Sequence, residues 1–233
     1  MGKEHNRRAA MKRLEVIVEG QSEREFVFQV LAPYLERCGV VKSYEVFPIV
    51  IRTSPNHRGG VSKYQHLKDD ILKSLSSSNQ QLVVSMMIDY FRLPSNMPYP
   101  DNLDSLGSDS DRATAIEQKI AEDVNDNRFI PYIQVHEFEA FLYASSSGFG
   151  YCYGNDESRM KLLCDIIDNF KNPEEINTTP SGAPSKRILS IIPEYDKVAD
   201  GNLIIMQNGI DSILNTCPRF NNWVKTLIKR LSR

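Results

Sequence analysis

The feature that most limits how this chain folds is a strand–glycine–helix junction near its start. Residues 14–18 (LEVIV) are mostly apolar and β-branched, which is typical of a buried strand. After Gly20, residues 22–37 place apolar side chains along one helix face, and Ser22 with Glu25 forms a capping-box pattern. A strand that turns directly into a helix predicts the first unit of a parallel α/β sheet.

The same alternation of strand and helix continues along the chain. The run at 82–88 is the most continuous apolar segment and predicts a central strand buried on both faces. Strands are expected at 14–18, 44–51, 82–88 and 130–135, and helices at 22–37, 62–75 and 112–124, with another starting at 137–143. We therefore expect an α/β fold with a mainly parallel sheet flanked by helices.

The pattern changes after residue 145, where strand signals become scarce. Helices are expected there at 157–170, 185–191, 203–214 and 220–231, joined by loops that contain Pro or Gly. We predict two parts. Residues 1–144 form the α/β core, with a basic tail at 1–12, and residues 145–233 form a helical C-terminal appendage packed on the core.

Composition narrows the class of protein. No apolar run approaches the roughly 20 residues that span a membrane, and residues 1–13 lack the apolar segment of a secretory signal. The four cysteines show no C-x-x-C spacing, which argues against zinc and predicts reduced thiols in the cytoplasm. A net charge of −2 predicts no general affinity for nucleic acid. The basic clusters within 3–13 and 225–233 are either solvated ends or a patch that binds nucleic acid.

Three acidic residues are expected at the carboxyl edge of the sheet, where parallel α/β folds keep their active sites. Glu19 ends the first strand, Glu23 lies in the first turn of the next helix, and Asp89 follows the third strand. Close carboxylates repel one another unless a cation lies between them, so this group predicts a hard metal ion. The alternative is that Asp89 only caps the loop that follows it.

Two more acids follow the fourth strand in the segment His136-Glu137-Phe138-Glu139-Ala140. If a helix begins near Glu137, the side chains of Glu137 and Glu139 diverge by about 200°; if the segment is extended, they share a face. In either case at least one faces the strand ends. The pair has either a metal-binding role or the ordinary role of acids at a helix N-terminus. We expect His136 to be a hydrogen-bonded structural residue, with metal ligation as the alternative.

Candidate contacts for an anionic partner lie in two places. Lys186 and Arg187 are expected in the first turn of a helix, where the dipole disfavours cations, so a phosphate would be favourable there. The alternative is an exposed basic turn. Arg92 starts the long, Pro-containing loop 92–110 at the end of the third strand, a place where loops are often functional. We predict contacts with nucleic acid at Arg92 and Arg187.

Several stretches together resemble a known family. They are VEGQSEREFV, MIDYFRLP, PYIQVHEFEAFL, PEEIN, APSKRILSIIPEYDK and CPRFNNWV, and they span nearly all of the chain. The chain looks like a member of the family catalogued as domain of unknown function 4276, within the Toprim-like group. Its first acids and Asp89 also resemble the Toprim domain of topoisomerases, bacterial primases and nucleases of the overcoming-lysogenisation-defect type.

The resemblance implies an acidic centre that binds Mg²⁺, with Mn²⁺ as a substitute. It implies that Glu19 acts in acid–base chemistry or binds the metal, and that Glu23 and Asp89 bind the metal. By the same resemblance, Lys186 would supply positive charge to the scissile phosphate. Toprim domains usually carry Asp-x-Asp on the third strand, where this chain has Asp89-Tyr90-Phe91. Glu137 or Glu139 is the expected replacement for the second acid.

The implied function is a Mg²⁺-dependent nuclease, with DNA as the expected substrate, in an antiphage or DNA-processing system beside an ATPase partner. The missing second Asp keeps an alternative open, which is a catalytically inactive module that binds an ATPase through the helical appendage. Nucleotide transfer, as in primases, is a third and weaker alternative, since the sequence shows no zinc ribbon. An oligomer is compatible with each function.

Overall fold

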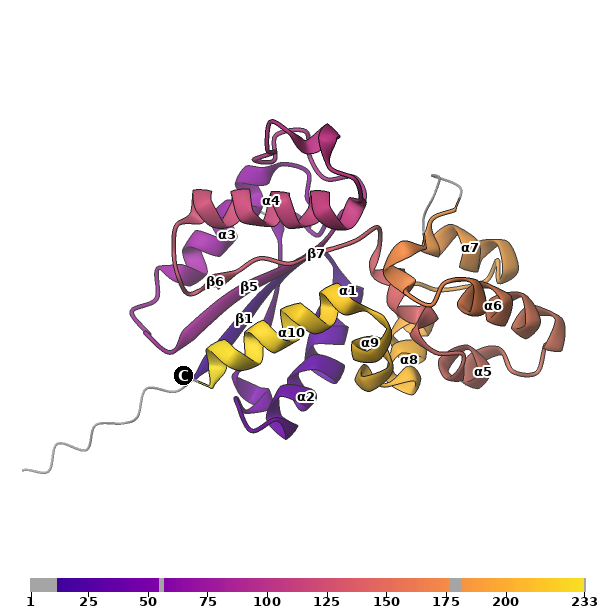
Figure 1. Ribbon diagram of the computed structural model, residues 1–233. Helices are drawn as coiled ribbons and strands as arrows, with labels where there is room; N and C mark the ends of the chain where they lie inside the picture. Colours follow the sequence, from indigo (N-terminus) through magenta and orange to yellow (C-terminus); the bar gives the residue numbers. More distant parts are fainter. Residues whose placement is uncertain (1–11, 55–56, 177–181, 233) are drawn as a thin grey trace, which may run out of the picture.

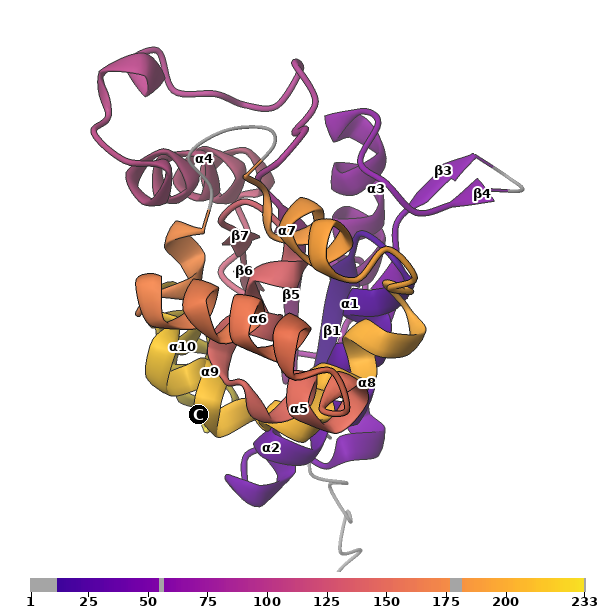
Figure 2. The same cartoon turned by 90° about the vertical axis from the view of Figure 1, so that its right-hand side faces the viewer.

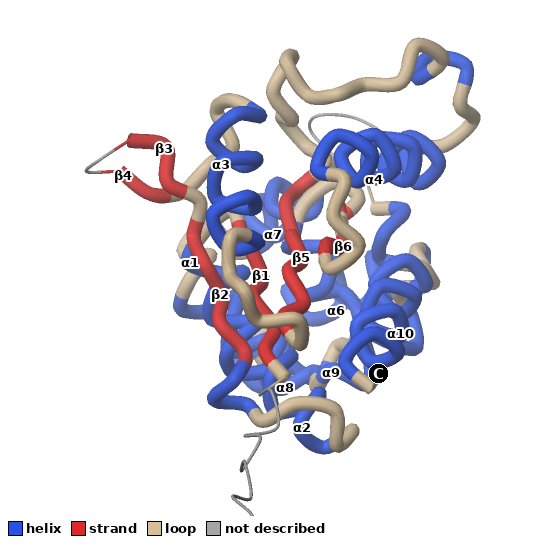
Figure 3. Tube along the Cα trace, turned by 90° about the vertical axis from the view of Figure 1, so that its left-hand side faces the viewer, coloured by secondary structure: helices blue, strands red, loops and turns tan. Residues whose placement is uncertain are grey.

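The structure is a computed structural model that describes residues 12–54, 57–176 and 182–232. Neighbouring parallel strands form its central sheet in the order β2–β1–β5–β6 (Figure 3), and β7 also pairs with β5 in parallel. The strands are β1 (Arg13–Val18), β2 (Val46–Val50), β5 (Leu82–Asp89), β6 (Phe129–Ile130) and β7 (Ile133–Gln134). The expected α/β fold with a mainly parallel sheet is confirmed. The basic cluster predicted in the N-terminal tail lies outside the described residues, apart from Lys12 and Arg13.

Helices cover both faces of this sheet (Figure 1). On one face the buried cluster includes Ile17 and Met86, and on the other it includes Val16 and Phe220. The first face carries α3 (Tyr64–Leu75) and α4 (Asp109–Val124), and the second carries α1 (Gln21–Phe26), the π-helix η1 (Val27–Leu31), α2 (Ala32–Arg37) and α10 (Pro218–Leu231). Alternate residues of β1 therefore enter different cores, as the two-residue period of a strand requires.

Six further helices lie beyond the carboxyl ends of the strands (Figure 2). They are the 3₁₀-helix η4 (Phe138–Ala144), α5 (Ser147–Tyr153), α6 (Glu157–Asn169), α7 (Pro184–Ile191), α8 (Ala199–Asn208) and α9 (Ile210–Thr216). Ile204 and Ile213 belong to the same buried cluster as Val16, so these helices share a core with the sheet. The division at residue 144 stays a prediction. No helix in the described part of the chain is both long and apolar enough to cross a membrane.

Two elements differ from the sequence-based expectation because of single residues. The strand expected at 130–135 is two short strands separated by Pro131, which has no N–H to donate to the ladder. The helix expected at 203–214 is two helices that meet at Gly209, whose φ of 73° ends the first one.

The beginning of the chain also differs in detail. The first helix begins at Gln21 with Gly20 as its N-cap and without a side-chain cap, so the expected capping box of Ser22 is wrong. It widens into a π-helix just before Pro33, whose ring crowds the carbonyl four residues earlier. The second strand ends at Val50, and β3 (Arg52–Ser54) pairs antiparallel with β4 (His57–Arg58), a pair that the periodicity did not predict.

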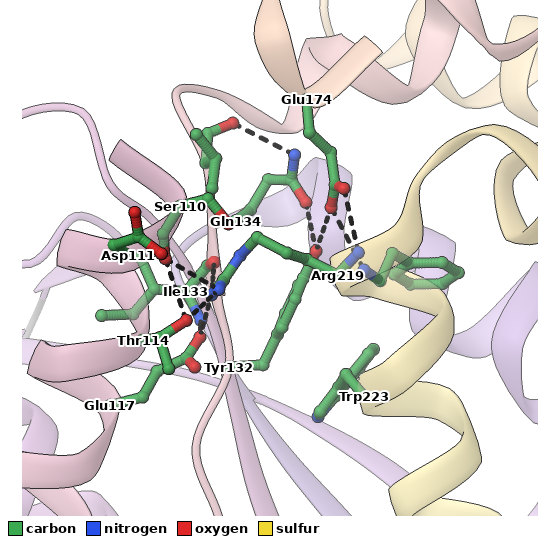
Figure 4. Close-up of polar contacts among 12 residues, drawn as sticks. Ser110, Asp111, Thr114, Glu117, Tyr132, Ile133, Gln134, Glu174, Arg219 and Trp223 are labelled. Atoms are coloured by element: carbon green, nitrogen blue, oxygen red, sulfur yellow. Dashed lines mark hydrogen bonds and ion pairs between the residues drawn. The ribbon is translucent and has the colours of Figure 1, made fainter. Parts of the chain in front are cut away.

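The last helix is held on the sheet by buried polar contacts (Figure 4). Glu174, in the 3₁₀-helix η5 (Pro173–Glu175), accepts the backbone N–H groups of Arg219 at 3.0 Å and Phe220 at 3.1 Å. A distant side chain therefore caps α10, because the first N–H groups of a helix have no partner within it. The Arg219 guanidinium pairs with Glu117 of α4 at 2.6 Å, and Glu117 also accepts the Ile133 N–H at 2.7 Å.

Aromatic contacts complete this attachment. The Trp223 ring stacks on Tyr132 with centroids 4.7 Å apart. Its Nε1 donates to Ser85 Oγ at 2.9 Å, and that hydroxyl donates to the Ile130 carbonyl at 2.6 Å. The stretches PYIQV, PEEI and CPRFNNW thus meet at one place and join α10 to β5 and β6. We call the group Glu117, Tyr132, Glu174, Arg219 and Trp223 the α10 clasp.

Removal of one charge from the clasp tests its contribution to stability. We expect Arg219→Met to lower the free energy of unfolding by about 1–3 kcal/mol, because it removes the charge partner of the half-buried Glu117 carboxylate, which keeps the Ile133 N–H. The double variant Glu117→Gln/Arg219→Met is expected to recover part of that loss. Urea denaturation measures both, and a single variant as stable as the parent would contradict the assignment.

Candidate functional site

Three of the predicted acids meet at the carboxyl edge of β1 and β5. These strands are parallel neighbours with Val18 opposite Met87, so Glu19 follows β1 beside Ile88, one residue before Asp89 at the end of β5. The backbone N–H of Asp89 donates to Oε2 of Glu19 at 3.3 Å. Glu23 comes from the first turn of α1, and its buried carboxylate lies against Gly20, where an added Cβ would come within 3.1 Å of Oε2. The glycine leaves room for this carboxylate.

Glu139 is the fourth acid of the group, whereas Glu137 lies apart from it. Glu139 is only 1% exposed, and its negative charge acts on both Glu19 and Asp89. Glu137 instead accepts the backbone N–H of Ser185 at 3.0 Å and so caps α7. We call Glu19, Glu23, Asp89 and Glu139 the carboxylate cluster. Of the two acids, Glu139 is the one that the structure places at this edge.

A lysine that the sequence did not single out completes the group. Lys197 lies in the turn before α8, and its Nζ is 3.2 Å from Oε1 of Glu139. The carboxylate of Asp196 accepts the N–H groups of Val198 at 2.9 Å and Ala199 at 2.7 Å, which orients the turn. Lys197 ends the stretch APSKRILSIIPEYDK, but nothing in its local pattern marks it as functional. Only the packing of α8 against α1 and η4 brings it to the cluster.

The three predicted basic residues lie elsewhere. Lys186 is exposed on α7. Arg187 donates from Nε to the Gly182 carbonyl at 2.7 Å, and its guanidinium covers the Phe170 ring at 5.2 Å. Arg92 is exposed, has a φ of 64° and stacks over Phe91. Among the hydrogen bonds and ion pairs of the described residues, none joins these three side chains to the carboxylate cluster.

The positions next to the cluster serve other contacts. Tyr90 follows Asp89, and its hydroxyl interacts with Arg112 of α4. His136 is buried, has a φ of 67° and lies 3.9 Å from the Asp109 carboxylate. Burial lowers the pKa of His136. Both residues face the start of α4, and the structural role expected for His136 agrees with this position.

Burial and mutual repulsion change the proton affinity of the cluster. Burial, reinforced by Glu23, raises the pKa of Glu19 to about 6. Burial, together with Glu23 and Glu19, raises the pKa of Asp89 well above its usual value. The pKa of Glu139 is raised by burial against the opposing effect of Lys197. Burial disfavours the charged amine of Lys197, but Glu139, Asp89 and Glu23 together hold its pKa above the usual value. The cluster therefore needs more positive charge than one ammonium supplies.

Unsatisfied oxygen atoms support the same conclusion. Within the described residues, five buried polar side-chain atoms lack a hydrogen-bond partner, and two of them are Asp89 Oδ1 and Glu139 Oε2. A third is the hydroxyl of Tyr195, two residues before Lys197. Buried polar atoms nearly always have a partner. Three buried oxygen atoms without a hydrogen-bond partner in one region indicate that the site can accept an additional ligand.

The donor chemistry of the cluster fits a hard divalent cation. It offers only carboxylate oxygens, which Mg²⁺ and Mn²⁺ prefer. In the part of the chain that the structure describes, no three His, Cys, Asp or Glu side chains already have the mutual arrangement of a metal site. Lys197 holds Glu139 in this arrangement, so the side chains would have to converge around the ion.

Comparison with known proteins identifies a family and nothing finer. The model of the family described as Domain of unknown function (DUF4276) matches residues 18–228. No curated protein and no solved structure matches the chain. The matched range contains the whole carboxylate cluster, Lys197 and the α10 clasp.

The raised pKa of Glu19 predicts how stability changes with pH. The folded state holds the proton of Glu19 more tightly than the unfolded state. The contribution of Glu19 to stability is therefore fully present below about pH 4.5 and is lost as the pH rises through about 6. In the metal-free protein, the free energy of unfolding should drop less between low and high pH in Glu19→Gln than in the parent, by up to about 2 kcal/mol. Urea denaturation in a chelator at pH 4.5 and 8 measures it. The surface variant Glu25→Gln is the control, and an unchanged pH dependence in Glu19→Gln would contradict the prediction.

Proposed function

We propose that this chain, which belongs to the family described as Domain of unknown function (DUF4276), is a metal-dependent nuclease of Toprim type. The observation that supports the proposal is the carboxylate cluster at the carboxyl edge of a parallel sheet, with Lys197 beside it. Active sites of open α/β sheets lie at this edge. Buried carboxylates without a full set of partners are unfavourable unless they bind a cation, which gives them a functional rather than a stabilising role.

In this proposal Glu19, Glu23, Asp89 and Glu139 hold Mg²⁺ or Mn²⁺. When bound, the metal neutralises charge on the phosphate and lowers the pKa of water. Glu19 either binds the metal or accepts a proton from the attacking water. In the metal-free protein, burial and Glu23 raise its pKa to about 6, which makes it more basic than a free carboxylate. Glu139 takes the place of the second Asp of the Toprim pattern. The proposed relation to Toprim nucleases rests on this assignment of Glu139 and on the stretches VEGQSE and MIDY.

Lys197, rather than Lys186, is the cation that we assign to the scissile phosphate. Its amino group already lies among the carboxylates, whereas Lys186 is exposed on α7. Arg92 and Arg187 remain our candidates for contacts with nucleic acid away from the cluster. Their present contacts with Phe91 and Phe170 leave the positive charge of each guanidinium intact.

The setting of this activity is part of the proposal. We propose DNA as the substrate, an ATPase as the partner protein, and an antiphage or DNA-processing role. All four cysteines are unpaired, which agrees with the reducing cytoplasm that we propose as the location. An oligomer is compatible with this setting.

One observation favours the second candidate, a catalytically inactive module that binds an ATPase. Lys197 already pairs with Glu139, and β5 ends in a single Asp, so the cluster is partly neutralised without a metal. In that case the C-terminal helices would form the docking surface, where Tyr151, Leu162 and Met206 expose apolar side chains. Metal binding and nuclease activity separate the two candidates.

The nuclease proposal predicts cleavage of DNA that requires Mg²⁺ or Mn²⁺ and stops when a chelator is added. We expect Glu19→Gln and Asp89→Asn each to lower the cleavage rate at least about 100-fold, because each removes a carboxylate from the reacting centre. Glu25→Gln, on the exposed side of the same helix, is the matched control and should cleave normally. Cleavage that survives both variants would contradict the proposal, and absence of metal binding would favour the inactive module.

A comparison of two lysines tests the assignment of the phosphate contact. Lys197→Met is expected to reduce cleavage at least about tenfold at saturating metal, because a positive charge at the phosphate is lost. Lys186→Met is expected to reduce it much less. The assignment is wrong if Lys186→Met causes the larger loss.

A further inference from the structure

Lys197 reaches the carboxylate cluster from the surface of the protein. Its side chain is 47% exposed, whereas that of its partner Glu139 is 2% exposed. The Lys197 side chain therefore lies largely at the surface, and its amino group contacts a buried carboxylate. A lysine in this position can leave the site by a rotation of its own side chain.

The turn that carries Lys197 is anchored independently of the cluster. Asp196 caps α8, and its own N–H donates to Asp200 at 2.9 Å. Asp200 also accepts the hydroxyl proton of Tyr153 at 2.7 Å. Between this turn and the cluster, the polar contacts of the described residues are the Lys197–Glu139 ion pair and a long bond of 3.5 Å from Ser22 Oγ to the Lys197 carbonyl. Loss of the ion pair would leave the turn attached to α8.

Lys197 satisfies the cluster incompletely. Its ammonium pairs with Oε1 of Glu139, while Oε2 of Glu139 and Oδ1 of Asp89 lack a partner, as does the hydroxyl of nearby Tyr195. A divalent ion carries twice the charge and binds six or more oxygens. Lys197 therefore neutralises the carboxylates less completely, and binds fewer of their oxygens, than a divalent cation would.

We propose that Lys197 and the divalent cation are alternative counter-ions of the carboxylate cluster, so that metal binding releases Lys197 from Glu139. The inference rests on the proposed function and describes the regulation of the same site. Without metal, the lysine offsets repulsion among the carboxylates. With metal, the released ammonium is available to the substrate phosphate, so the phosphate contact forms only after the metal has bound.

This arrangement makes metal affinity and nuclease activity respond in opposite directions to loss of the lysine. Lys197→Met removes the internal competitor, so metal should bind about tenfold more tightly or better, since like charges no longer compete for the same oxygens. The same variant loses the phosphate contact and cleaves more slowly. A lysine that only stabilised the folded cluster would leave metal affinity unchanged or lower.

Titration calorimetry with Mn²⁺ on the full chain tests the inference directly. The variants are Lys197→Met, Lys197→Arg and the control Lys161→Met, whose lysine is exposed on α6. We expect tighter binding for Lys197→Met and parent-like binding for the other two. Equal or weaker binding by Lys197→Met would overturn the inference. If Lys197→Met does not fold, Glu139→Gln serves instead, with the rate of acetylation of Lys197 as its measurement.

Acetylation of lysine amino groups, measured by mass spectrometry, adds a readout that does not depend on activity. In the parent protein, Mn²⁺ should speed acetylation of Lys197, because its amino group leaves the ion pair with Glu139, whereas in Glu139→Gln acetylation of Lys197 should be fast without metal. No change with metal in the parent would overturn the inference. Absence of Mn²⁺ binding in the parent would overturn the metal-dependent proposal as well. Tighter binding by Lys197→Met in a protein without nuclease activity would support the inference and overturn only the nuclease.

Discussion

Four carboxylates share one partly buried edge of the sheet, and their repulsion is the constraint on which the rest of this structure depends. The fold offsets it with the ammonium of Lys197, with the Asp89 N–H bound to Glu19, and with raised pKa values that favour protonated acids. Each of these lowers the repulsion without removing it. A site that keeps unsatisfied buried oxygens is unfavourable for stability, which is why we interpret it as functional.

The same constraint explains why the C-terminal helices belong to the site. Lys197 reaches Glu139 only if α8 packs against α1 and η4, and that packing continues through α9 to α10. The α10 clasp then holds the final helix on β5 and β6 through Glu174, Arg219 and Trp223 (Figure 4). The stretches that resemble the family thus divide into two groups. One group supplies charge to the site, and the other attaches the helices that bring this charge there.

Local pattern predicted most elements, and single residues account for the failures. Periodicity located the central strand and the helices on both faces, because burial on one face imposes a period on the sequence. It missed the split at Pro131 and the break at Gly209, since one residue changes the backbone without disturbing the apolar pattern around it. Local pattern gave no signal for Lys197, because nothing in an irregular turn marks a lysine as functional. The phosphate role of Lys186, which the resemblance implied, stays a prediction.

The sequence by itself determined the parallel α/β fold and the position of Glu19, Glu23 and Asp89 at one edge of its sheet. Strand direction and a two-residue period are local properties, and parallel strands necessarily bring their carboxyl ends to one edge. The tertiary structure decided that Glu139 joins the cluster while Glu137 caps α7, and that Lys197 supplies the positive charge. Those contacts depend on how helices far apart in the chain pack against one another. The energy of that packing comes from long-range contacts, which a local pattern of residues does not reveal.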